Sequence, residues 1–97
     1  MEIPWHLIVY ELKFLGKAAD DLKKIDRAHQ RIIKDKLLIL AENPGALKNN
    51  IIRLSADEDL YRLRVGSYRV VFKKDGNRLT ILIVRIGHRK EIYLSLA

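Results

Sequence analysis

The hydrophobic pattern of this sequence changes its period at one tripeptide, Asn43-Pro44-Gly45. Before it, apolar residues recur every three or four positions, as they do on one face of a helix. After Asn50, apolar and polar residues alternate or form short apolar runs, as they do in strands. Because helices and strands are segregated along the chain, we predict an α+β fold. Its helices would lie on one face of a mostly antiparallel sheet.

The first half predicts one strand and two helices. Residues 5–10 form a short apolar run with β-forming side chains, which predicts an N-terminal strand. Residues 12–24 follow with helical spacing, and Asp26 is a suitable cap for a second helix that ends before Pro44. The brief break between the two helices predicts an antiparallel helical hairpin with one shared apolar face.

The second half predicts a sheet of about four strands and a short C-terminal helix. The expected strands of this half are residues 51–54, 60–65, 68–74 and 78–86. Gly66-Ser67 is a two-residue hairpin connection with glycine at its first central position. The last strand is almost continuously apolar, so we expect it inside the sheet and ending at Gly87. The opposite face of the sheet is expected to stay open.

Positive charge is concentrated in the last third of the chain. The 97 residues, which we expect to form one domain over 1–97, carry a net charge of +7. Residues 1–59 are neutral by count, so the excess belongs to nine basic residues against two acids. The nine are Arg62, Arg64, Arg69, Lys73, Lys74, Arg78, Arg85, Arg89 and Lys90. A solvated basic face is one interpretation, but the predominance of arginine favours a surface that binds nucleic acid.

Strand alternation places Arg62 and Arg64 on the same face of their strand. The two-residue hairpin that follows should bring Arg69 close to both. Three convergent guanidinium groups on a sheet face make a plausible phosphate cradle.

Several classes of function are excluded by composition and spacing. The chain has no cysteine, so it has no disulfide, thiol nucleophile or cysteine-ligated zinc. No Asp, Glu and His cluster has metal-ligand spacing, and no glycine-rich nucleotide loop occurs, so we expect no metal and no cofactor. Neither a membrane-spanning run nor a signal peptide is present, and we expect a soluble, cytoplasmic protein without membrane contact.

Two segments resemble the RelE branch of the RelE/ParE toxin superfamily. They are the run Tyr61–Phe72 (YRLRVGSYRVVF) and the run Ile86–Tyr93 (IGHRKEIY). The segment Ala18–Ile25 and the helix that ends at Asn43-Pro44 resemble the helical hairpin of the same family. The resemblance implies a metal-independent endoribonuclease that cleaves messenger RNA, typically on the ribosome, by attack of a 2′-hydroxyl on the neighbouring phosphate.

The same resemblance implies roles for particular residues. Arg69 matches the family's phosphate-binding arginine, and Arg89 matches a second arginine near the scissile phosphate. Tyr93 matches a tyrosine implicated in base chemistry or stacking. Arg62 and Arg64 stand where well-studied members carry lysines, one of them a proposed general base.

Arginine stays protonated, so neither Arg62 nor Arg64 suits the role of general base. We therefore predict that His88 and Tyr93 perform the acid and base steps, without assigning which does which. The basic side chains expected to add phosphate contacts are Lys73, Arg85 and Lys90.

Two other functions stay open. The ParE branch of the superfamily inhibits gyrase by protein contact, and an inactive RNA-binding relic is also compatible with the sequence. Both toxin hypotheses imply a cognate, RelB-like antitoxin protein in a hetero-oligomer. The ribonuclease hypothesis also implies messenger RNA and the ribosome as partners.

Overall fold

The structure is a computed structural model, described here for residues 9–55 and 57–96 and for side chains as far as Ile92. The elements follow in the order β1 (Glu11–Phe14), α1 (Gly16–Lys23), α2 (Arg27–Glu42), the 3-10 helix η2 (Pro44–Asn50), β2 (Ile51–Ser55), β3 (Leu60–Val65), β4 (Tyr68–Asp75), β5 (Thr80–His88) and α3 (Arg89–Leu96). Within these residues, no helix is both long enough and apolar enough to cross a lipid bilayer.

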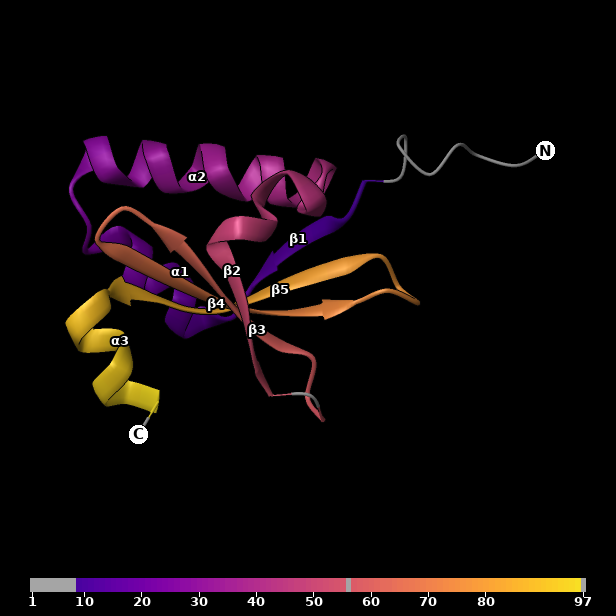
Figure 1. The fold of residues 1–97 in the computed structure, drawn as a ribbon. Helices are drawn as coiled ribbons and strands as arrows, with labels where there is room; N and C mark the ends of the chain where they lie inside the picture. The colour runs from indigo at the N-terminus through magenta and orange to yellow at the C-terminus, as the bar shows by residue number, and fades with distance from the viewer. Residues whose placement is uncertain (1–8, 56, 97) are drawn as a thin grey trace.

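The strands form a single mixed sheet in the order β1-β5-β4-β3-β2 (Figure 1). The strands β2 to β5 pair antiparallel, and β1 adds to β5 in parallel at the edge. The predicted α+β architecture and the interior position of the last long strand are confirmed, since β5 lies between β1 and β4. The sheet has five strands rather than about four.

The predicted place of the N-terminal strand is wrong. Residues 5–8 lie outside the described part of the chain, and Val9 and Tyr10 belong to no strand. The strand is Glu11–Phe14, whose last three residues fall within the predicted first helix, and α1 begins only at Gly16. The physical reason is that hydrogen bonds to the edge of β5 stabilise these residues as a strand. The Glu11 N–H donates to the Leu79 carbonyl at 2.8 Å, and β1 pairs with residues 80–83. Four residues are too few for their own periodicity to separate a helix from a strand.

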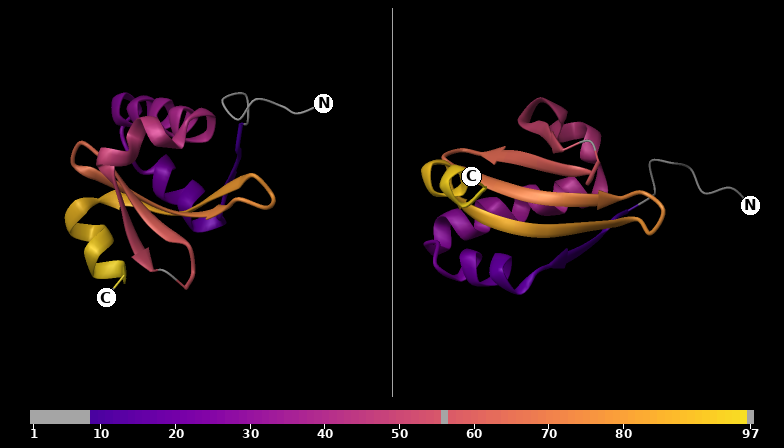
Figure 2. Two further views of the ribbon diagram at one scale, coloured as in Figure 1. Left: turned by 45° about the vertical axis from the view of Figure 1, so that its right-hand side comes forward. Right: turned by 90° about the horizontal axis from the view of Figure 1, so that it is seen from below.

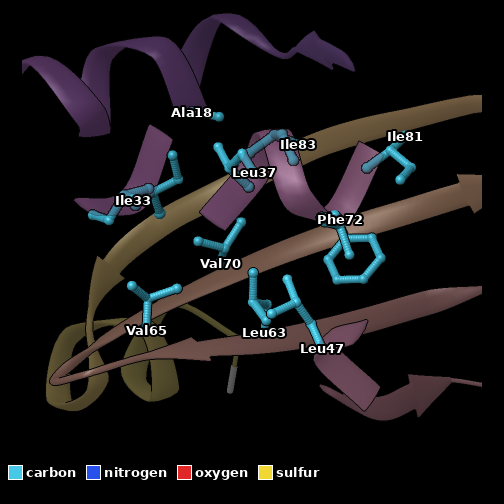
Figure 3. Packing of buried hydrophobic residues seen from close by; sticks show 12 residues of the cluster. Ala18, Ile33, Leu37, Leu47, Leu63, Val65, Val70, Phe72, Ile81 and Ile83 are labelled. Atoms are coloured by element: carbon cyan, nitrogen blue, oxygen red, sulfur yellow. The ribbon is translucent and has the colours of Figure 1, made fainter. Parts of the chain in front are cut away.

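The two helices of the first half bury their apolar residues against one side of the sheet. Asp26 caps α2 as predicted, because its carboxylate accepts a hydrogen bond from the His29 N–H at 3.2 Å. The core residues that α1 and α2 contribute include Ala18, Ile33 and Leu37, and those from β3, β4 and β5 include Leu63, Val70, Phe72, Ile81 and Ile83 (Figure 3). Packing of this apolar face is the main source of stability of such a small domain.

The prediction that the opposite face of the sheet stays open is wrong. Helix α3 lies on the side away from α2 and covers one end of the sheet (Figures 1 and 2). Gly87 does not end β5, which continues through His88 directly into α3. A Cβ atom added at Gly87 would lie 3.6 Å from Cδ1 of Ile92, and Ile92 is buried. The glycine therefore lets α3 pack close to the sheet.

Candidate nucleic-acid interface

A row of four residues crosses the sheet at the end nearest α3. In the register of β3 and β4, Arg64 lies opposite Arg69, and in that of β4 and β5, Arg69 lies opposite Gly87. Ile51 pairs with Leu63, so one further step of this register brings Asn50 opposite Arg64. The row therefore reads amide, cation, cation, glycine, and its two cations face the same side of the sheet.

The tight hairpin between β3 and β4 makes this juxtaposition possible. Gly66 has a φ of +59°, a left-handed conformation that glycine adopts without strain, as the turn requires at this position. Its carbonyl and that of Tyr68 accept hydrogen bonds from Nη1 of Arg69 at 2.8 and 2.9 Å. The turn thus both brings the two arginines together and holds the guanidinium of Arg69.

One pocket of about 250 Å³ is lined by the arginines of β3 and β4, which are Arg62, Arg64 and Arg69. Its lining residues are Asn49, Asn50, Ile52, Arg62, Arg64 and Arg69. The prediction that the hairpin brings Arg69 to Arg62 and Arg64 is confirmed. We call this site the arginine pocket.

Arg69 is an unusual residue for the interior of a protein. Only 8% of its surface is exposed, and among the described residues no carboxylate forms an ion pair with it. A buried charge without a counter-charge is costly, and like charges directly opposite one another on neighbouring strands are destabilising. Arg69 carries the cost of burial, and it shares the repulsion with Arg64, which is exposed. A bound anion would relieve both costs. The arginine pocket is therefore chemically suited to an oxyanion such as a phosphate.

Arg85, predicted as a phosphate contact, has a different environment. Its Nε and Nη2 atoms lie 2.8 and 3.3 Å from the two carboxylate oxygens of Asp21 on α1. These hydrogen bonds raise the pKa of the Arg85 guanidinium. Asp21 also accepts the Ile86 N–H at 3.0 Å, on the part of β5 that β1 does not cover. The structure therefore neutralises Arg85 against α1 and does not bring it into the arginine pocket.

Lys73, the other predicted contact from the sheet, lies at the far end of β4. It is four residues from Arg69, a separation of about 13 Å along a strand. It lines a different hollow of about 610 Å³ beside the β4–β5 turn, together with Glu58, Asp59 and Asp75. Lys13, Lys74 and Arg78 line the same hollow, so it holds charges of both signs. The lining of the arginine pocket contains no acidic residue.

His88 faces the other side of the sheet from the arginine pocket. It pairs with Tyr68, and the centroids of the two rings lie 6.0 Å apart. The Tyr68 ring in turn lies 5.2 Å from that of His29 on α2, so both Tyr68 and His88 are on the α2 side. Since Arg69 is the next residue after Tyr68, its side chain takes the opposite face. The β-sheet therefore separates His88 from Arg69.

The remaining predicted residues are on α3. The Arg89 N–H donates to the Ser67 carbonyl at 2.9 Å, which ties the start of α3 to the hairpin that holds Arg69. The side chains of Arg89 and Lys90 are exposed. Tyr93 follows the buried Ile92 on the same helix, and its side chain lies outside the described part of the structure.

Asn49 and Asn50 were missed by the sequence analysis. Both precede β2, and only the pairing of β2 with β3 places them beside the sheet arginines. The only sequence signal was two adjacent amide residues immediately before a strand. Nothing in the sequence around them indicates which strand β2 pairs with.

Comparison with known proteins decides the family. The sequence profile of the ParE toxin of the type II toxin–antitoxin system parDE matches residues 12–93. The chain is a member of the RelE/ParE toxin superfamily. The RelE-like resemblance of its two motifs is thereby confirmed at the level of the superfamily.

Individual relatives agree with this assignment. Toxin RelE3 of Methanocaldococcus jannaschii is 40% identical over 47 residues, a match that spans 48% of this chain and only 51% of that relative. A putative RelE-like toxin protein of Escherichia coli is 29% identical over 83 residues and is covered to 84%, as is this chain. The toxin in the archaeal RelE–RelB complex from Pyrococcus horikoshii superposes with a TM-score of 0.74 at 27% identity, covering 84% of this chain and 96% of its own.

Proposed function

We propose that this toxin is a metal-independent endoribonuclease that cleaves messenger RNA and so inhibits translation. The observation that carries the proposal is the pair of facing arginines, Arg64 and Arg69, in one pocket with Arg62. A phosphodiester supplies the negative charge that the pocket lacks, and arginine offers forked donors that match its oxygens.

In the proposed reaction, the 2′-hydroxyl of the RNA attacks the adjacent phosphorus while a base removes its proton. The bond to the 5′-oxygen of the next nucleotide breaks, and an acid protonates that oxygen. The products are a 2′,3′-cyclic phosphate and a 5′-hydroxyl. The arginines stabilise the additional negative charge of the five-coordinate phosphorane, and this electrostatic contribution is typically among the largest in catalysis.

We assign the acid–base chemistry to α3 rather than to His88. The sheet lies between His88 and the arginine pocket, whereas α3 packs over Gly87, in the same row as Arg69. Tyr93 is our candidate for proton transfer or base stacking, and Arg89 is our candidate for a further phosphate contact. Lys90 and Lys73 would add attraction for RNA at longer range.

Partners follow from the family. The solved structures from Pyrococcus horikoshii and Methanococcus jannaschii are complexes of RelE with RelB. We propose a RelB-like antitoxin for this chain, in a hetero-oligomer, with an acidic segment that neutralises the arginine pocket. The ribosome and its messenger RNA are the proposed targets of the free toxin, which places its action in the cytoplasm.

Inhibition of gyrase is the second candidate, and two observations favour it. The matching family profile is that of the ParE toxin. Arg62 and Arg64 also stand where the resemblance to RelE implies lysines in well-studied members. In that case the arginine pocket would bind an acidic protein surface rather than RNA.

The two functions separate in one experiment. The wild type, Arg69→Ala and Tyr93→Phe are induced in bacteria, and a reporter message is analysed by primer extension. Arg78→Ala is the matched control, because Arg78 is an exposed arginine of the β4–β5 turn. We expect new cuts with the wild type and the control, and a loss of at least about a hundredfold with Arg69→Ala.

Each other outcome has a defined meaning. Growth arrest with intact messages would contradict the ribonuclease and support gyrase inhibition. Neither arrest nor cleavage would indicate an inactive RNA-binding relic. Unchanged cleavage by Tyr93→Phe would exclude proton transfer by the Tyr93 hydroxyl, and it would leave stacking of the ring and the role of the arginines intact.

A further inference from the structure

The amide of Asn50 is the neutral polar group in the row of residues that crosses the sheet. Asn50 is the last residue of η2, immediately before β2 begins at Ile51, and it is half-buried. Its Oδ1 atom accepts a hydrogen bond from Nη2 of Arg64 at 3.2 Å. This contact joins η2 to β3 through two residues that are 14 positions apart in the chain.

An amide partner differs from the partners of other arginines in this protein. Arg53 bonds to the carboxylate of Asp59 at 3.1 Å, and Arg85 to that of Asp21 at 2.8 Å. A carboxylate orients an arginine and also cancels its charge. An amide oxygen accepts the same hydrogen bond without any counter-charge. Asn50 therefore holds Arg64 in place and leaves its full charge for a ligand.

Orientation of Arg64 before binding has a physical benefit. A long side chain loses rotamer freedom when it is ordered, and that loss weakens binding unless it has already occurred in the free protein. The neighbouring Arg69 is fixed in the same manner, by two neutral carbonyl groups. Both facing arginines are thus oriented by neutral acceptors.

We infer that Asn50 is a positioning residue, which holds Arg64 oriented and charged in the arginine pocket for a phosphate group of single-stranded RNA. This inference rests on the proposed function for the identity of its ligand. It does not depend on that function for the contact between Asn50 and Arg64.

A double-mutant cycle tests whether Asn50 acts through Arg64. The affinity for a short single-stranded RNA, made uncleavable by 2′-O-methyl groups, is measured by fluorescence anisotropy for Asn50→Ala, Arg64→Ala and the double variant. We expect Asn50→Ala to weaken binding about three- to tenfold in the wild type, the effect of one hydrogen bond, and less than about twofold beside Arg64→Ala. The same full loss in both backgrounds would overturn the inference.

Two aspartate variants separate orientation from charge. Asn50→Asp would form an ion pair with Arg64, and we expect a loss of affinity at least as large as that of Arg64→Ala. Asn49→Asp adds the same charge to the same pocket, which it also lines, without a bond to Arg64. Equal losses for the two variants would show that only the overall field matters and would contradict a specific role of Asn50.

A measurement without ligand keeps the inference independent of the proposed function. Nitrogen-15 relaxation of the Arg64 side chain is recorded in the free wild type and in Asn50→Ala, with thermal unfolding as a check that the variant folds. We expect an ordered guanidinium in the wild type and a mobile one in the variant. An equally mobile Arg64 in both would overturn the inference. Failure of the wild type to bind RNA, with Arg64 ordered only in the wild type, would instead contradict the proposed function.

Discussion

At the scale of single residues, the hydrogen-bond partners separate arginines whose charge is already neutralised from arginines whose charge is available to a ligand. Arg53, Arg78 and Arg85 each lie within 4 Å of an aspartate oxygen. Arg64 and Arg69 are held by an amide and by carbonyl groups instead. All of these are arginines of the same basic chain, so composition alone does not separate them. The chemistry of the acceptor does, because only a carboxylate removes the charge that a ligand would otherwise use.

Asp26 provides a residue-scale prediction about pH. The hydrogen bond between its carboxylate and the His29 side chain, 2.7 Å long, and the bond from the His29 N–H lower the pKa of Asp26 below its usual 3.8. A carboxyl group with a lowered folded-state pKa contributes stability above its unfolded-state pKa and loses it as the pH falls through the folded-state value. Asp26→Ala should therefore melt at a lower temperature than the wild type at pH 7, and the difference should shrink as the pH falls below the ordinary aspartate pKa of 3.8.

Circular dichroism melts over a series of pH values measure this effect. Asp35→Ala is the control, since Asp35 is an exposed aspartate in the middle of the same helix and away from its cap. A difference between Asp26→Ala and the wild type that stays constant down to pH 2 would contradict the assigned role of the carboxylate.

At the scale of elements, the packing of α3 depends on the absence of a bulky side chain at Gly87. A Cβ atom there would reach ordinary contact distance from Ile92, and a branched side chain would overlap with it. We expect Gly87→Ala to be tolerated, whereas Gly87→Val should destabilise the protein by about 1–3 kcal/mol through overpacking and displace α3. Urea unfolding measures the stability, and hydrogen exchange of the α3 amides measures the displacement. Equal protection of α3 in both variants would show that α3 does not depend on this close approach.

At the scale of the whole molecule, charge is divided between a neutral first part and a basic last third. If Arg62, Arg64 and Arg69 contact RNA phosphates, the logarithm of the binding constant should fall with the logarithm of salt concentration with a slope of about −2 or steeper. Removal of any one of the three should reduce the slope by about 0.7. Arg85→Ala should leave the slope unchanged, because Asp21 already neutralises Arg85. Anisotropy titrations at several salt concentrations provide the slopes, and an identical slope in all variants would mean that these arginines do not contact phosphate.

Helix and strand identity followed largely from local pattern. The cap at Asp26, the end of α2 before Pro44, the bounds of β3 and the two-residue turn at Gly66 were all predictable, since each depends on residues adjacent in the chain. The convergence of the sheet arginines was predictable for the same reason, because one short hairpin creates it. The error at β1 arose where four residues are stabilised by a strand almost seventy positions away, in a pairing of Glu11 with Thr80.

The sequence by itself determined the types and order of most elements and the location of the positive charge. Only the tertiary structure decided which charges remain available. Asp21 and Arg85 are 64 residues apart and meet because α1 covers the free edge of β5. Gly87 and His88 are consecutive, so local alternation already puts them on opposite sides of the sheet. Only the packing of distant elements places one of them beneath α3 and the other beside Tyr68. The reason is that local pattern fixes the alternation of side chains, whereas the packing of distant elements fixes what each side chain meets.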